Sequence, residues 1–370
     1  MAGAVFGVPA VAHALIQRRL RAPEAPGWGR THRFAGHLGP IVFQELGAGE
    51  PIVLLHAFGP GYDAGQWRAA AEALAPHCRV LAPDLPGWGR SVPLDPRPEA
   101  YLASLADFLT GVIWSPALLV AAGHAAPYAV HLAAEHPGLV RGVALVAPRG
   151  LHAGGDDLDE LDRRLDEREE LDELDALDEP DEVEDLDERD REDDLDDDDL
   201  DEDDLDEDDP DERDRTQDLD EPEAAFPSQP LVADLLRVPF LRISVLDVLT
   251  SRAVLAAYLR NHAYAAPERV DAALLEHHYR VSHLPAHRLA LAAFWRGELE
   301  LAAAAALRHL HVPVRVILGG GDDPDRLAAD GLPAGSGIET IAGTRALPHA
   351  EKPIAVGEAL SRFLAGLPAA

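Results

Sequence analysis

Apolar residues along this chain form two alternating patterns. Segments with helical spacing, such as Gly65–His77, Glu99–Ile113 and the closing Pro353–Leu367, lie between short continuous apolar runs. Runs of that kind are typical of strands buried on both faces of a sheet. The alternation predicts a mostly parallel sheet covered by helices on both faces. The predicted strands lie near Thr31–Phe34 and Ile41–Leu46, at Pro51–His56, at the start of Cys78–Ser91, and at Ala117–Gly123, Val140–Pro148, Val312–Gly321 and Gly337–Gly343.

The alternation is interrupted after the run Val140–Pro148. A low-complexity acidic tract occupies 156–223, and a helical segment rich in Ala, Leu and Arg extends from Phe226 to about Leu310. The next strand follows at Val312, so the helical segment is inserted between two strands of one sheet. We therefore expect a helical cap.

The acidic tract carries almost all of the net charge of −35. It holds 43 acidic residues and 7 arginines, whereas the remainder holds 24 acidic and 25 basic residues. Like charges repel, and the tract has little apolar surface to offset the entropy of ordering, so we expect a disordered insertion. An arm that binds cations or a protein partner weakly is the alternative. Its charge disfavours nucleic-acid binding.

The first residues raise the question of location. Ala2–Ile16 is mostly apolar, but Arg18, Arg19 and Arg21 follow it rather than precede it, which is the reverse of a signal peptide. We expect a short amphipathic helix in a cytoplasmic protein, with peripheral membrane contact as the alternative. Cys78 is the single cysteine, so no intrachain disulfide forms, which fits a reducing compartment.

Two motifs in combination carry a resemblance to a known family. The turn "PDLPGWGRS" ends at Ser91, and the run "HLAAEHPGLVRGVALVAP" ends at Pro148. With the order of strands and helices, these motifs resemble the α/β-hydrolase superfamily. The resemblance implies an α/β-hydrolase fold with a mostly parallel central sheet and a helical cap after the sixth strand. It implies a segmentation into an extension at 1–29, a first core part at 30–155, the acidic insertion at 156–223, the cap at 224–310 and a second core part at 311–370.

The family's nucleophile lies on a sharp turn between a strand and a helix. Aligning this chain by that turn places Ala125 at the nucleophile position, and "AAPYA" resembles a Ser-Ala-Ala-Tyr-Ala variant whose serine is replaced. A methyl group cannot attack a carbonyl carbon. The resemblance implies oxyanion-hole N–H groups from Ala126 and from Ala57 or Phe58, with His124 beside the nucleophile position.

The resemblance also implies an acid and a histidine later in the chain. The acid would be Asp323 or Asp322, after the strand Val312–Leu318. In the family's Gly-x-Gly-His ending the histidine position holds Ala346 here, so His349 is the candidate base. Each also has a structural interpretation, because Asp323 can cap a helix that begins at Pro324 and His349 can orient a loop.

Other reactive side chains fit less well. His56 is expected to brace the loop after its strand, and Ser91, Ser115 and Cys78 lie outside the turn. The cap holds a group of histidines, but Pro285 separates the two that have zinc-helix spacing. We expect surface or pocket-lining histidines without a metal site, and no nucleotide cofactor. The histidines are His277, His278, His283 and His287.

Three functional hypotheses follow. The first is a catalytically impaired member of the family that binds a small apolar or acyl ligand under the cap. The second is an active hydrolase of ester-type bonds that uses water activated by His349 and Asp323. The third is an interaction protein that acts through its acidic arm.

Overall fold

The computed structural model describes residues 28–93, 95–151, 230–322, 332–333 and 335–368. Most of the predicted N-terminal extension, the acidic tract and Asp323 lie outside these residues. Internal contacts divide the chain into one unit formed by 1–153 and 224–370 and another formed by 154–223. All the described residues belong to the first unit.

The core of this unit is an eight-stranded sheet in the order β1-β2-β4-β3-β5-β6-β7-β8. The first two strands form a hairpin, and β2 pairs antiparallel with β4. All other neighbours are parallel. This confirms the mostly parallel sheet predicted from the apolar runs. The strands are β1 (Arg30–Gly36), β2 (Gly39–Leu46), β3 (Pro51–Leu55), β4 (Arg79–Pro83), β5 (Ala117–Ala122), β6 (Val140–Val146), β7 (Val314–Gly319) and β8 (Gly337–Ile341).

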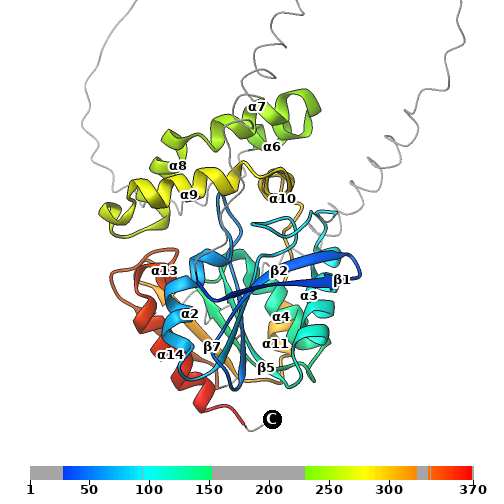
Figure 1. Ribbon diagram of the computed structural model, residues 1–370, viewed down its shortest axis with the longest axis vertical. Helices are drawn as coiled ribbons and strands as arrows, with labels where there is room; N and C mark the ends of the chain where they lie inside the picture. The colour runs from blue at the N-terminus through cyan, green and yellow to red at the C-terminus, as the bar shows by residue number, and fades with distance from the viewer. Residues whose placement is uncertain (1–27, 94, 152–229, 323–331, 334, 369–370) are drawn as a thin grey trace, which may run out of the picture. The chain divides into compact units, whose positions relative to one another are not determined.

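The two central strands, β3 and β5, are apolar and buried at every position, so both faces of the sheet need a covering layer. Successive side chains point to opposite faces, so Val53 and Leu119 join one core while Leu54 and Val120 join the other. Helices α3 (Pro98–Val112) and α4 (Ala126–Glu135) cover the first face, and α2 (Arg68–Leu74) and α14 (Pro353–Ala365) cover the second (Figure 1).

The part of the segment between β6 and β7 that the structure describes in detail, from Pro230 to Arg308, is mainly helical, as predicted. Figure 1 shows its helices α6–α10 as a layer at one end of the sheet, while α11 packs against α4. Pro285 begins α10 and His283 caps the end of α9, so His283 and His287 lie on different elements. The helices are α6 (Pro230–Arg237), α7 (Pro239–Leu249), α8 (Arg252–Tyr258), the π-helix η3 (Leu259–Ala263), the 3-10 helix η4 (Pro267–Arg269), α9 (Ala272–Ser282), α10 (Pro285–Trp295) and α11 (Ala304–Arg308).

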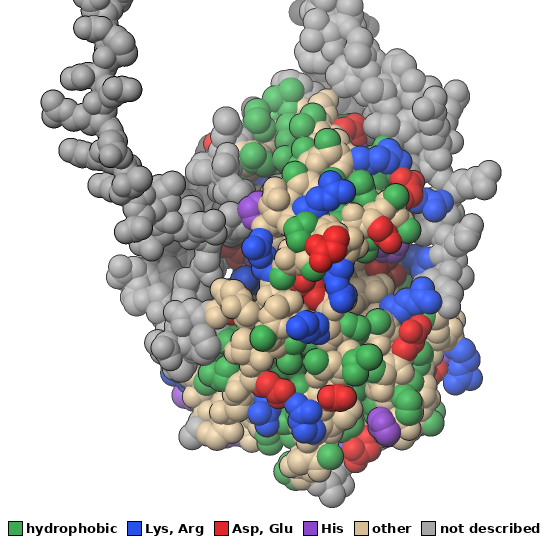
Figure 2. Space-filling view, turned by 90° about the vertical axis from the view of Figure 1, so that its left-hand side faces the viewer, with side chains coloured by type: hydrophobic (Ala, Val, Ile, Leu, Met, Phe, Trp, Pro, Cys, Tyr) green, Lys and Arg blue, Asp and Glu red, His purple; other side chains and the backbone are tan. Residues whose placement is uncertain are grey.

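The described surface mixes charges of both signs. Figure 2 shows acidic and basic side chains interspersed with apolar ones over one face. This distribution agrees with the near balance of acidic and basic residues outside the acidic tract. No helix among the described residues has the length and apolar character needed to cross a bilayer.

Candidate functional site

The turn after β5 is where the family resemblance places a nucleophile. A 3-10 helix, η2 (Gly123–Ala125), joins β5 to α4. Gly123 has the positive φ of +53°, whereas Ala125 has helical angles of −79° and −10°. The left-handed conformation of the turn therefore falls on Gly123, two residues before the position expected from the sequence. Glycine adopts such angles without the steric cost that a Cβ brings.

Little room surrounds this glycine on one side. A Cβ placed on Gly123 would lie 3.0 Å from the Cβ of Ala57, in the loop after β3. Ala125 is 1% exposed and belongs to the core on the α4 face. Neither residue presents an oxygen or sulfur atom at the turn.

Two of the expected oxyanion-hole donors have partners within the protein. The N–H of Ala57 donates to the Oε1 of Gln66 at 3.0 Å. The N–H of Ala126 donates to the carbonyl of Gly123 and closes the 3-10 turn. An oxyanion hole needs N–H groups aimed at an empty position, so these two N–H groups are not free for that role in this conformation.

Aromatic side chains pack beside the turn. The Phe58 ring stacks on Trp88 at 5.3 Å and lies 5.4 Å from the Tyr128 ring. Phe294 of the cap helix α10 contacts both Phe58 and His124, with the His124 centroid 4.9 Å away. Burial, with a further contribution from the charge of Arg149, lowers the pKa of His124 to about 4. His124 is therefore neutral at pH 7.

His349 lies in the four-residue helix α13 (Pro348–Glu351) and is completely buried. Its ring stacks on Trp67 of the 3-10 helix η1 (Ala64–Trp67), with centroids 4.0 Å apart. Neither ring nitrogen has a hydrogen-bond partner among the described residues. Burial, and then the charge of His56, lower its pKa to about 3. A general base normally bonds to an orienting carboxylate, and no carboxylate of a described residue bonds to His349.

The candidate acid that can be described is Asp322. Its Oδ2 accepts the N–H of Gly319 at 2.8 Å, and its Oδ1 lies 3.1 Å from a guanidinium nitrogen of Arg149. Asp322 therefore pairs with an arginine rather than with His349. Asp323, the first choice from the sequence, lies outside the described residues.

The loop that carries Ala346 and His349 is attached by one buried carboxylate. Glu351 is 2% exposed, and its Oε1 accepts the N–H of Arg345 at 2.6 Å. Its Oε2 accepts the N–H of Ala265, in the cap, at 2.7 Å. Ala346 itself is half-buried.

His56 has the bracing role expected from the sequence. The N–H of Leu85 donates to its Nε2 at 3.0 Å, so Nδ1 carries the proton and donates to the carbonyl of Ala57 at 2.8 Å. Burial lowers its pKa to about 4. Ser91 is also structural, because its hydroxyl donates to the carbonyl of Asp84 and accepts the N–H of Val42.

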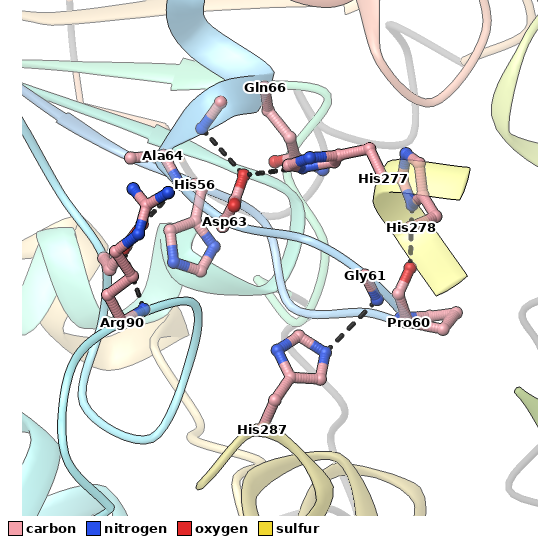
Figure 3. Close-up of polar contacts among 12 residues, drawn as sticks. His56, Pro60, Gly61, Asp63, Ala64, Gln66, Arg90, His277, His278 and His287 are labelled. Atoms are coloured by element: carbon pink, nitrogen blue, oxygen red, sulfur yellow. Dashed lines mark hydrogen bonds and ion pairs between the residues drawn. The ribbon is translucent and has the colours of Figure 1, made fainter. Parts of the chain in front are cut away.

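The cap histidines contact the loop after β3 (Figure 3). His278 donates from Nδ1 to the carbonyl of Pro60 at 2.9 Å, and the N–H of Gly61 donates to Nε2 of His287 at 3.2 Å. Both imidazoles are buried, and burial lowers their pKa values to about 4 and about 3. The sequence analysis expected surface or pocket-lining histidines, but His278 and His287 are buried against this loop. The sequence does not reveal that two cap helices pack against the loop. Among the described residues, no group of three potential ligands is arranged to hold a metal.

Gly61 allows this close approach, so the variant Gly61→Ala should be strongly destabilised. Its φ is +73°, and a Cβ there would overlap the backbone of His278. Left-handed strain of about 1–2 kcal/mol adds to an overpacking cost of about 1–3 kcal/mol. Urea unfolding measures the loss. Gly335, with φ of +86° and nothing within 4 Å of a Cβ, is the matched control. Equal losses of unfolding free energy in Gly61→Ala and Gly335→Ala would show that α9 does not pack closely against Gly61.

Two carboxylates, the half-buried Asp63 and the buried Asp84, complete this network. Asp63 caps η1 through the N–H of Gly65 and lies 3.2 Å from Nε2 of His277. Burial opposes ionisation of Asp63, but His277 outweighs it and lowers the pKa. Burial, reinforced by the charge of Asp63, raises the pKa of Asp84 to about 7.

Sequence reasoning overlooked Asp63, Asp84 and Arg149. Asp84 lies in the motif "PDLPGWGRS" that supported the family resemblance, so a signal for it was present. Arg149 follows the last residue of β6 by three positions, at the sheet edge where β5 also ends. The carboxyl ends of parallel strands form the usual ligand site of such sheets, which was the available signal.

Comparisons with known proteins agree with this architecture. A sequence model of the α/β-hydrolase fold matches residues 50–175. The 2-hydroxy-6-oxo-2,4-heptadienoate hydrolase of Pseudomonas putida is 32% identical over 111 residues, which cover 29% of this chain and 40% of that protein. A pimeloyl-(acyl-carrier protein) methyl ester esterase of Chromobacterium violaceum is 39% identical over 107 residues, with the same coverage. The match thus spans about 40% of the length of these curated relatives.

A solved structure extends the comparison to the whole fold. The epoxide hydrolase CorEH has a TM-score of 0.62 at 16% identity, covering 91% of this chain and 98% of its own. Together with the sheet topology, these matches show that the chain has the α/β-hydrolase fold. The curated proteins that it matches over part of their length are named as hydrolases or esterases.

Proposed function

We propose that this chain binds a small apolar or acyl ligand beneath the cap helices and does not hydrolyse it. In this proposal Gly123, rather than Ala125, is equivalent to the family's nucleophile. The positive φ of Gly123 directly after β5 carries the assignment, because a nucleophile elbow is a strained strand-to-helix turn. A glycine there provides no atom for acyl transfer.

The remaining catalytic positions support the same proposal. Ala346 replaces the histidine of the family's usual ending. His349 is buried against Trp67, and neither of its ring nitrogens bonds to a described residue, whereas Asp322 is paired with Arg149. A water molecule activated by His349 would need an imidazole that is oriented and reachable. The buried position and lowered pKa of His349 argue against that route.

The chemistry of the surrounding side chains favours an apolar or acyl ligand. Phe58, Tyr128 and Phe294 bring aromatic rings to the turn from the core and from the cap. By their names, one relative hydrolyses 2-hydroxy-6-oxo-2,4-heptadienoate and another hydrolyses the methyl ester of a pimeloyl group on an acyl-carrier protein. Ligand binding by this chain would use the same end of the sheet without the covalent step.

The decisive measurement is ester turnover by the unaltered protein. We expect hydrolysis of p-nitrophenyl butyrate to be equal in the parent and in His349→Gln, and a fluorophosphonate probe to label neither. Turnover that disappears in His349→Gln would overturn the proposal, because it would show that the imidazole is catalytic.

Adding a serine to the turn and a histidine at position 346 should create ester hydrolysis only when the serine is at position 123. Gly123→Ser combined with Ala346→His should raise ester turnover by roughly 10²-fold, the usual contribution of a positioned acid or base. Adding Ala57→Gly would relieve the contact at 3.0 Å. Ala125→Ser with Ala346→His is the matched control and should stay at the parent level. Activity in the control alone would return the nucleophile position to residue 125.

A further inference from the structure

The positively charged residue Arg149 lies beside the turn where the proposed ligand would bind. Strand β6 ends at Val146, and Ala147 then adopts a φ of +42°, which is unusual for a residue with a side chain. This bend brings Arg149 next to the turn, where its backbone N–H donates to the carbonyl of Gly123 at 3.1 Å. Backbone strain of this kind is often found at functional sites.

The guanidinium of Arg149 is only partly engaged. One terminal nitrogen lies 3.1 Å from Oδ1 of Asp322 and 3.5 Å from the carbonyl of Pro148. Its Nε and its other terminal nitrogen make no hydrogen bond to a described residue. The side chain is 38% exposed while that of Asp322 is 8% exposed. Asp322 therefore binds one terminal nitrogen of the Arg149 guanidinium, and the partly exposed remainder of the group can bind a ligand.

The charge of Arg149 affects the pKa values of one residue on the turn and one residue on the cap. It contributes, after burial, to the low pKa of His124 on the turn, and it opposes the burial that raises the pKa of Tyr258 on cap helix α8. His124 contacts the ring of Phe294 but makes no hydrogen bond to a described residue. A positive charge and a neutral imidazole thus lie near a turn that has no side chain at Gly123.

From this arrangement we infer that Arg149 binds the carboxylate of the ligand, which is then an acid with an apolar tail rather than an ester. The inference rests on the proposed function. A planar guanidinium can give a carboxylate two parallel N–H···O bonds. Asp322 acts as a positioning residue, since it fixes one edge of the fork. The apolar tail of the ligand would lie toward Phe58 and Phe294.

Butyrate and its neutral analogue butyramide are suitable probes, with the full-length chain followed by NMR. Butyrate should bind the parent at least about 10-fold more tightly than butyramide, as expected for charge-assisted hydrogen bonds. Butyrate should also raise the pKa of His124, because its negative charge offsets that of Arg149. Added salt should weaken butyrate binding more than butyramide binding.

Arg149→Gln should abolish the preference for butyrate, and Arg149→Lys should keep part of it. Arg362→Gln is the matched control, because Arg362 forms a similar pair with Glu339 on the surface, and it should change neither affinity. Equal affinity of the parent for both probes, or no binding of butyrate, would overturn the inference. The shift of the His124 pKa in the parent tests it even if Arg149→Gln does not fold. Ester turnover, measured separately, decides the proposed function.

Discussion

Acidification from pH 7 to about pH 4.5 should unfold this protein. Four completely or almost completely buried histidines are neutral in the folded state, with pKa values of about 4 for His56 and His278 and about 3 for His287 and His349. The unfolded chain binds these protons near pH 6.5, so stability is lost as the pH falls below that value. Each histidine contributes roughly 1.4 kcal/mol per pH unit. Asp84, with its pKa raised to about 7, and His277, whose pKa Asp63 raises despite burial, oppose this trend, whereas His124, with a pKa of about 4, adds to it.

Urea unfolding at a series of pH values measures this effect. His287→Gln keeps an acceptor for the N–H of Gly61 and removes one titrating group, so its slope should fall by about 1.4 kcal/mol per pH unit. Ile354→Gln is the control, because Ile354 is 67% exposed and carries no titrating group, and its slope should match the parent. A parent stability that is flat between pH 6.5 and 4.5 would contradict the burial of neutral imidazoles.

Trp67→Ala should cost about 3–5 kcal/mol, the usual range for removing a buried aromatic side chain. Trp67 has no exposed surface and covers one face of His349, so its loss leaves a large cavity beside a buried imidazole. Urea unfolding of the variant measures the loss, and the titration of His349 reports whether water enters.

Trp114→Ala is the matched control. Trp114 is 91% exposed, so its removal should change stability by less than about 0.5 kcal/mol. If the two tryptophan variants lost similar stability, the packing of η1 against α13 would differ from the structure described here.

The parallel sheet could be predicted because its strands carry an unambiguous signal. Strands β3 and β5 are buried at every position, and such a requirement leaves a continuous apolar run in the sequence. The proline that begins α10 likewise marked the break between the two cap helices. These features depend on local sequence, so no knowledge of the tertiary packing was needed.

The site was harder to predict because its geometry depends on contacts between distant segments. The run from Ala121 to Ala126 consists of small residues apart from His124, so composition alone does not show which residue takes the turn conformation. The left-handed preference of glycine at Gly123 was the available signal. The stacking of His349 on Trp67 and the pairing of Asp322 with Arg149 join segments that are far apart in the chain. No spacing rule reveals such pairs.

The carboxylate of Glu351 attaches the loop before α14 through backbone N–H groups, and not through the side chains of that loop. One carboxylate binds backbone N–H groups on two segments, including Ala265, which is 86 residues away in the chain. Neither bond involves the side chain at position 346 or 349. The attachment of this loop to the cap is therefore independent of the side chains at those two positions, and it should persist in variants that replace either of them.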